Sequence, residues 1–136
     1  MGAAEPNKAL PKDPLKGIPI AEFARKLRRG ELTIEAIIRD YLTRIDTLDP
    51  RLGAFEFVAA DSALESASAL DRLLAAGCDL GPLMGVPIGI KDLFAVSGTP
   101  VTAGSRIDIA DLVGAEGSFV KLLRKAGCVI LGKTRR

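Results

Sequence analysis

The chain has 136 residues, 48% hydrophobic and 26% charged, with a net charge of +2, two cysteines and no histidine. This length suits one globular domain with a modest core. The missing imidazole excludes Ser-His-Asp and Cys-His catalysis, and two cysteines cannot build a Cys₂His₂ or Cys₄ zinc site. Neither a metal nor a cofactor is expected. Any acid–base chemistry falls to lysine, carboxylates, tyrosine or cysteine.

Residues 1–16 contain three prolines and no apolar period, which predicts a disordered or loosely tethered arm ahead of a folded part at 17–136. The arm lacks the apolar core of a signal peptide. No run in the chain approaches the roughly 20 apolar residues that span a bilayer. Two cysteines without an export signal indicate reduced thiols in a cytoplasmic protein, and no membrane partner is expected.

Hydrophobic spacing predicts helix, helix, strand, helix, strand, helix and strand along the chain. The corresponding ranges are 19–29, 33–48, 54–58, 60–76, 88–94, 115–126 and 128–131. Pro19 suits a first helical turn, Pro50 is expected to close the second helix, and Gly77 and Gly127 are expected to end two others. Residues 97–115 are predicted to be a loop. The order predicts an α/β fold with a partly parallel sheet.

Lys91 lies inside an otherwise apolar segment, Pro87 to Phe94, flanked by glycine-rich turns. A lysine between apolar walls loses hydration, which favours its neutral amine, and such an amine can take a proton from a hydroxyl group. Because the chain has no histidine, Lys91 is the leading candidate for a general base. The alternative is a structural lysine at a strand edge, or one paired with the adjacent Asp92.

The serines give no clear nucleophile. Ser62, Ser66 and Ser68 are predicted on the solvated face of a helix, whereas Ser97 and Ser105 fall in loops near Lys91 in sequence. None of the five lies in the G-x-S-x-G elbow that exposes a nucleophilic serine.

Residues 127–134 match the phosphate-binding pattern G-x-x-x-x-G-K-[ST]. That pattern requires a preceding strand and a following helix, but here a helix precedes it and its middle residues, Cys-Val-Ile-Leu, favour a strand. Nucleotide binding is therefore not expected, and a buried strand is predicted. A nucleic-acid or phosphate partner at the basic C-terminal end is the weakest of the functional alternatives.

Residues 81–134 resemble the N-terminal part of the amidase signature family. The matching runs are G-P-L-M-G-V-P-I-G-I-K-D at 81–92, T-A-G-S at 102–105 and L-R-K-A-G-C-V-I-L-G-K-T at 123–134. The resemblance implies a partial amidase-signature-like α/β core, with N-terminal helices followed by strands of a mixed sheet that these residues leave incomplete. It also implies that Gly132-Lys133-Thr134 ends a core strand.

The family hydrolyses carboxylic amides through an acyl-enzyme with a Ser–Ser–Lys triad, and its catalytic lysine matches Lys91. Asp92, Gly104 and Ser105 are implied as supporting residues. Both family serines lie in a Gly/Ser-rich loop downstream of the Gly-Lys-Thr segment, and no Gly-Gly-Ser-Ser-Gly run occurs here.

The resemblance therefore implies a truncated amidase that keeps the general-base lysine and is inactive alone. It would act on a small-molecule amide only when completed by downstream sequence. The alternative is a non-catalytic α/β binding or assembly module, which self-associates or joins a partner chain through unpaired strand edges.

Overall fold

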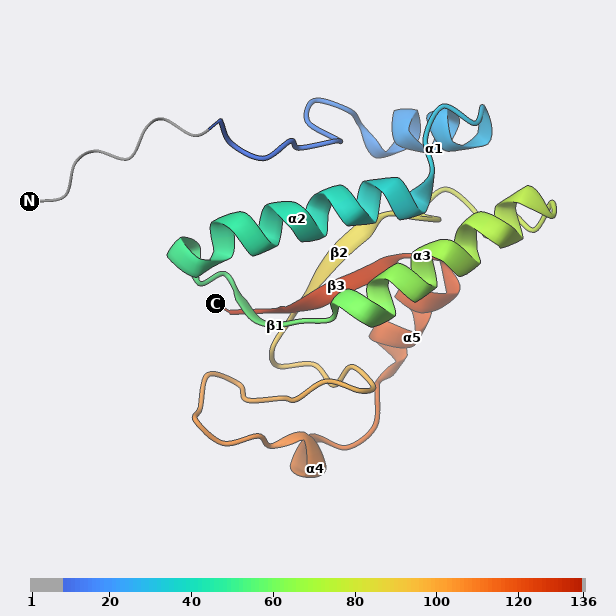
Figure 1. Ribbon diagram of the computed structural model, residues 1–136. Helices are drawn as coiled ribbons and strands as arrows, with labels where there is room; N and C mark the ends of the chain where they lie inside the picture. The colour runs from blue at the N-terminus through green and yellow to red at the C-terminus, as the bar shows by residue number, and fades with distance from the viewer. Residues whose placement is uncertain (1–8, 136) are drawn as a thin grey trace, which may run out of the picture.

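The computed structural model describes residues 9–135. Its elements, in chain order, are α1 (Ile20–Arg28), α2 (Ile34–Leu52), β1 (Phe55–Val58), α3 (Ala60–Ala75), β2 (Pro87–Lys91), α4 (Ala110–Val113), α5 (Ser118–Lys125) and β3 (Val129–Thr134). Helices α2 and α3 lie side by side across the sheet, and the segment that carries α4 forms a long loop beyond it (Figure 1).

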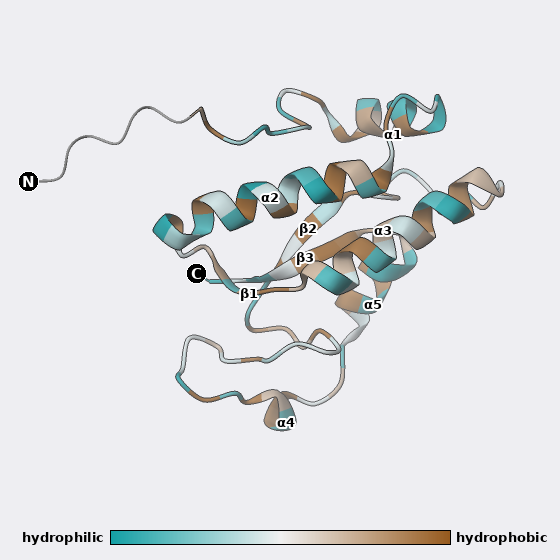
Figure 2. Ribbon diagram, viewed as in Figure 1, coloured by the Kyte–Doolittle hydropathy of each residue, from teal (hydrophilic) through white to brown (hydrophobic). Residues whose placement is uncertain are grey.

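The three strands form one sheet in the order β1–β3–β2. β2 pairs with β3 in parallel, and β1 pairs with β3 in antiparallel orientation, so the predicted α/β fold with a partly parallel sheet is confirmed. Strand β3 is central and covered on both faces, which explains its nearly continuous apolar sequence. Figure 2 shows β3 hydrophobic along most of its length.

Each face of the sheet has its own core. Val129 and Leu131 of β3 pack with buried residues of α1, α2 and α3. Ile130 points the other way and packs with Val120 of α5 and Val96. The alternation along β3 therefore divides the helices between the two faces.

Helix α2 corrects one prediction, because it continues to Leu52 with Pro50 inside it. Pro50 lies in the last turn of the helix, and the αL residue Gly53 (φ 59°) ends α2 by donating its N–H to the carbonyl of Asp49. The glycine, and not the proline, therefore terminates the helix.

Two further boundaries differ from the predicted ones. The predicted loop 97–115 contains α4, where Asp108 accepts the N–H of Ala110, and the next helix begins at Ser118 rather than 115. Strand β2 ends at Lys91 rather than Phe94, because the N–H groups of Leu93 and Phe94 both turn back to the carbonyl of Lys91.

The strand predicted for the phosphate-like pattern is confirmed and extends through Thr134 as β3. Close packing against β1 explains why a glycine stands at position 132. A Cβ on Gly132 would lie 2.1 Å from the carbonyl oxygen of Phe57 on β1. Gly89 on β2 is also closely approached, since a Cβ there would lie 2.7 Å from the Thr134 side chain. A glycine inside a strand often marks such a close approach to the backbone.

The described part of the N-terminal segment runs along α2. The Tyr41 hydroxyl donates to Asp13 at 2.7 Å, Arg44 donates to the carbonyl of Pro11, and Leu15 packs against the core. Residues 1–8 of the predicted arm lie outside the described residues. Within the described range, no helix has the length and apolar content needed to cross a membrane.

Candidate active site

A cleft opens where the two parallel strands end. Lys91 is the last residue of β2 and lies opposite Thr134, the last residue of β3. The antiparallel β1 begins at the same edge, where Phe55 faces Thr134. Sites in α/β sheets typically form outside the carboxyl ends of parallel strands. The cleft has a volume of about 520 Å³ and is lined by Glu56, Lys91, Asp92, Leu93, Ala103, Gly104, Thr134 and Arg135.

Lys91 is exposed at the mouth of this cleft, so the expectation that apolar walls enclose it is wrong for these residues. The strand is apolar through Ile90, but the chain turns away directly after Lys91 and leaves its side chain open on that side. Its Nζ forms no hydrogen bond or ion pair with residues 9–135.

The alternative of a Lys91–Asp92 pair is also wrong. Asp92 pairs with Lys133 of β3, with Nζ 3.0 Å from Oδ1, and the Lys133 side chain is 0% exposed. The second carboxylate oxygen of Asp92 accepts hydrogen bonds from the N–H and the hydroxyl of Thr102. Burial would raise the pKa of the Asp92 carboxyl, but the hydrogen bonds from Thr102 and Lys133 outweigh it and hold that pKa below its ordinary value.

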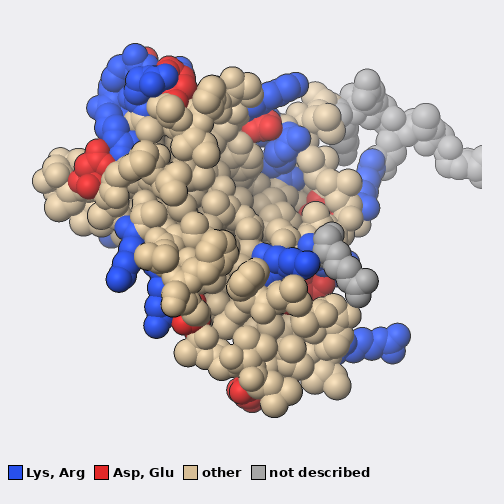
Figure 3. Space-filling view, turned by 180° about the vertical axis from the view of Figure 1, so that it is seen from behind, with Lys and Arg blue, Asp and Glu red and all other residues tan. Residues whose placement is uncertain are grey.

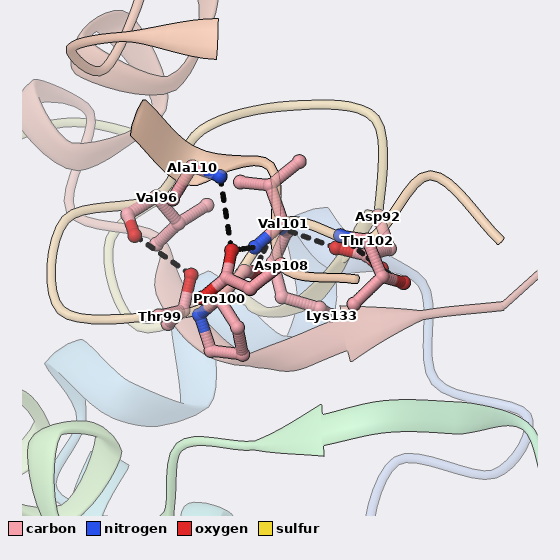
Figure 4. Close-up of polar contacts among 9 residues, drawn as sticks. All are labelled: Asp92, Val96, Thr99, Pro100, Val101, Thr102, Asp108, Ala110 and Lys133. Atoms are coloured by element: carbon pink, nitrogen blue, oxygen red, sulfur yellow. Dashed lines mark hydrogen bonds and ion pairs between the residues drawn. The ribbon is translucent and has the colours of Figure 1, made fainter. Parts of the chain in front are cut away.

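Asp92 also anchors the loop that follows it through its backbone. Its N–H donates to the carbonyl of Thr134 at 2.9 Å, and its carbonyl accepts from Ala103 at 3.0 Å. Lys133 extends the same network by donating to the carbonyl of Pro100 at 3.1 Å. Figure 4 shows the side chains of Asp92, Thr102 and Lys133, with Pro100, above the end of β3. The result is a closed loop that brings Ala103 and Gly104 to the cleft.

A second carboxylate closes the far side of that loop. Asp108 accepts the N–H groups of Val101 at 3.0 Å and Ala110 at 2.9 Å (Figure 4). Hydrogen bonding, first from Val101 and then from Ala110, lowers the pKa of the Asp108 carboxyl. Ile109 also donates its N–H to the Val101 carbonyl at 2.6 Å. The loop that borders Lys91 is therefore held by hydrogen bonds at both ends.

The cleft contains a second ion pair. Arg135 Nε lies 2.6 Å from Glu56 Oε2, with 55% and 29% of the two side chains exposed. Both carboxylates in the cleft are thus bonded to a cation other than Lys91. The arrangement leaves the Lys91 amine exposed in the cleft and without a carboxylate partner among the described residues, so it is accessible to a hydroxyl group.

Three of the four predicted site residues come together. Lys91, Asp92 and Gly104 all line the cleft, whereas Ser105 does not. The Ser105 hydroxyl donates to the carbonyl of Ile107 at 2.8 Å and accepts its N–H at 3.1 Å, so it serves its own turn.

The other serines gather elsewhere. Ser62, Ser66 and Ser97 line a separate cavity of about 240 Å³ beside Cys128. No serine of the described chain lines the cleft of Lys91. Nor does any group of His, Cys, Asp and Glu within residues 9–135 have the arrangement of a metal site.

Lys133 is the functional candidate that the sequence pattern did not reveal. Strict alternation along β3 would turn Lys133 to the same face as Val129 and Leu131. The pairing of β3 with β2 slips by one residue after Ile130, so Leu131 has no partner on β2. Residues of β3 after the slip point to the opposite face of the sheet from the one that strict alternation predicts, so Lys133 points towards the loop. Such an irregularity has no local sequence signal.

Comparison with known proteins identifies one family. The family model described as Amidase matches residues 36–135. The chain is 44% identical over 113 residues to a glutamyl-tRNA(Gln) amidotransferase subunit of Acidothermus cellulolyticus, in a match that covers 83% of this chain and 22% of that protein. It is 40% identical over 117 residues to the 2-amino-5-chloromuconic acid deaminase of Comamonas testosteroni, covering 86% and 25%.

A solved structure supports the same relationship. The native peptide amidase from Stenotrophomonas maltophilia matches with a TM-score of 0.81 and 33% sequence identity, covering 90% of this chain and 26% of that chain. The fold therefore corresponds to one part of that larger enzyme. The chain spans about a quarter of the length of these relatives.

Proposed function

The chain belongs to the amidase family, and from this premise we propose that residues 17–136 form the part of an amide hydrolase that carries its general base, Lys91. One observation carries the proposal. Lys91 is an amine without a counter-ion among the described residues, at the carboxyl end of a parallel strand, in a cleft whose other charges are paired.

In the proposed reaction, the neutral amine of Lys91 accepts a proton from a serine hydroxyl, directly or through a second serine. The serine oxygen then bonds to the amide carbonyl carbon. The C–N bond breaks as the leaving nitrogen receives the proton held by Lys91, and water hydrolyses the resulting ester. Both serines would come from sequence outside these 136 residues, so we expect no turnover by this chain alone.

The substrate class proposed is a small-molecule carboxylic amide. The similar proteins include a peptide amidase and a subunit of an amidotransferase, and the common element carried over to this chain is chemistry at a C–N bond. The cleft of about 520 Å³ beside Lys91 is the place where a serine hydroxyl and the amide would meet its amine.

A fusion tests this proposal. Residues 17–134 replace the matching segment of the Stenotrophomonas maltophilia peptide amidase, which supplies the rest of the enzyme. We expect the folded fusion to hydrolyse peptide amides, and Lys91→Met to lower kcat at least ~100-fold, because that range is typical for a general base. Lys125→Met, at an exposed position on α5, is the matched control. A folded fusion without turnover, or one that Lys91→Met leaves unchanged, contradicts the proposal.

A second proposal is association through strand edges. Within residues 9–135, β1 and β2 are the two edges of the sheet, and Leu93, Phe94 and Phe119 are exposed. Seen from behind, the molecule has a wide area free of charged side chains, with Lys and Arg at its margins (Figure 3). Unpaired edges and apolar faces favour a partner chain or a second copy. Light scattering that shows only monomer at high concentration would remove self-association.

A further inference from the structure

The positions of two lysines relative to one carboxylate carry a further inference. Lys91 and Asp92 are neighbours in sequence and line the same cleft. Lys133 lies on the adjacent strand, one register position from Lys91, since Lys133 pairs with Ile90 and Thr134 with Lys91. Asp92 therefore has one lysine beside it in sequence and another on the adjacent strand, and of these two only Lys133 forms an ion pair with it.

The choice of partner is enforced by geometry. Lys133 Nζ lies 3.0 Å from Asp92 Oδ1, and 0% and 6% of the two side chains are exposed. The remaining oxygen of Asp92 accepts two hydrogen bonds from Thr102. Every polar atom of the Asp92 side chain is thereby used, and none is directed to Lys91.

The net stability that a buried ion pair adds over apolar residues does not by itself explain Lys133. Taking an ammonium group and a carboxylate out of water costs several kcal/mol per ion, so a buried pair is weak support for the fold. Replacing both members of such a pair by apolar residues of similar volume is often neutral or stabilising. The pair therefore calls for an explanation other than stability.

We propose that Lys133 is a positioning residue for Lys91, because it engages the Asp92 carboxylate and so keeps it from pairing with the Lys91 amine. This inference gains its catalytic meaning from the proposed function. A free carboxylate next to Lys91 would hold the amine in an ion pair, and an amine held in that way is not available to accept a proton or to attack an acylating reagent. Glu56, the other carboxylate of the cleft, is also paired with a cation other than Lys91, the more exposed Arg135.

The chain as it stands allows a test that needs no amide hydrolysis. Trace acetylation with acetic anhydride reports the nucleophilicity of each lysine, and mass spectrometry gives the rate at Lys91 relative to exposed Lys121 on α5. Lys133→Gln removes the cation that pairs with the Asp92 carboxylate and replaces it with a neutral polar side chain. We expect the relative rate at Lys91 to fall about threefold, the effect of one partly exposed ion pair.

Three variants separate charge from structure. Lys133→Arg keeps the charge and is expected to keep the Lys91 rate within about twofold of the original chain, since the ion pair with Asp92 is retained. The double variant Asp92→Asn/Lys133→Gln has no carboxylate to release and is expected to restore the rate. Lys125→Gln makes the same substitution at an exposed site and is expected to change nothing.

The outcomes are distinct. A Lys91 rate that stays low in the folded double variant would show that the pair acts through structure and would overturn the inference, as would an unchanged rate in Lys133→Gln. If circular dichroism shows that Lys133→Gln does not fold, the double variant and Lys133→Arg decide: a slow Lys91 in either overturns it. An inactive fusion with this labelling pattern intact would contradict the proposed function alone.

Discussion

The ends of β2 and β3 place two lysines within one register position of each other in opposite environments. Lys91 is exposed and has no partner among the described residues, whereas Lys133 is fully buried and has two. Both follow an apolar strand. The difference arises because the chain turns directly after Lys91 and leaves its side chain exposed, whereas the loop from Asp92 to Ala103 folds over Lys133. An apolar neighbourhood in sequence therefore does not indicate which lysine is enclosed.

The largest expected difference is in stability. Lys133→Ala leaves the Asp92 carboxylate buried without its cation and is expected to lower the free energy of unfolding by ~3–5 kcal/mol. Lys91→Ala removes an exposed, unpaired side chain and is expected to change it by no more than ~0.5 kcal/mol. Urea unfolding followed by circular dichroism measures both. Equal losses would break the contrast between the two lysines.

A glycine precedes each of these lysines on its strand, and the two glycines are expected to tolerate a side chain to different degrees. A Cβ at Gly132 meets the backbone of Phe57 at 2.1 Å, which cannot yield, and Gly132→Ala is expected to destabilise the fold by ~3 kcal/mol. At Gly89 the contact is the Thr134 side chain at 2.7 Å, which can rotate, so we expect a loss of ~1 kcal/mol. Unfolding midpoints of the two variants test this order, and a more damaging Gly89→Ala would reverse it.

The buried pair also predicts an acid sensitivity. The pKa of Asp92 in the folded chain lies below its ordinary value of 3.8. The carboxylate therefore stabilises the fold fully above pH 3.8, and that contribution is lost as the pH falls through the folded pKa. Unfolding free energies measured from about pH 5 downwards should fall less steeply for Asp92→Asn/Lys133→Gln than for the original chain. Identical slopes would contradict the role assigned to Asp92.

The smallest effect is expected at the exposed pair of the same cleft. Arg135 and Glu56 remain partly solvated, and Arg135→Ala is expected to lower the free energy of unfolding by no more than ~1 kcal/mol. A comparison of low and high salt sharpens this expectation, because screening weakens an exposed pair more than a buried one. A loss comparable with that of Lys133→Ala would remove the distinction between the two pairs.

The sequence predicted those parts of the fold that depend on local periodicity. Ile34, Ile37 and Ile38 follow helical spacing and are buried on α2, and the mixed sheet follows from the order of the elements. Lys91 could be singled out because it interrupts an apolar run and matches a family motif. Pro50 was wrongly expected to end a helix, since a proline in a last turn interrupts few hydrogen bonds.

The network around Asp92 could not be predicted in this way. Its partners are Thr102 and Lys133, 10 and 41 residues further along the chain. They meet because of the register slip at Leu131 and the closure of the loop through Asp108. Both features depend on tertiary pairing, and no residue pattern in the chain indicates them.

Competitive acetylation of the unmodified chain tests the central claim most directly, because it compares the two lysines in a single sample. At low reagent concentration and near-neutral pH, the account predicts that Lys91 is acetylated readily while Lys133 stays protected until the protein unfolds in urea. Lys133 reacting as fast as Lys91 in the folded chain would contradict it.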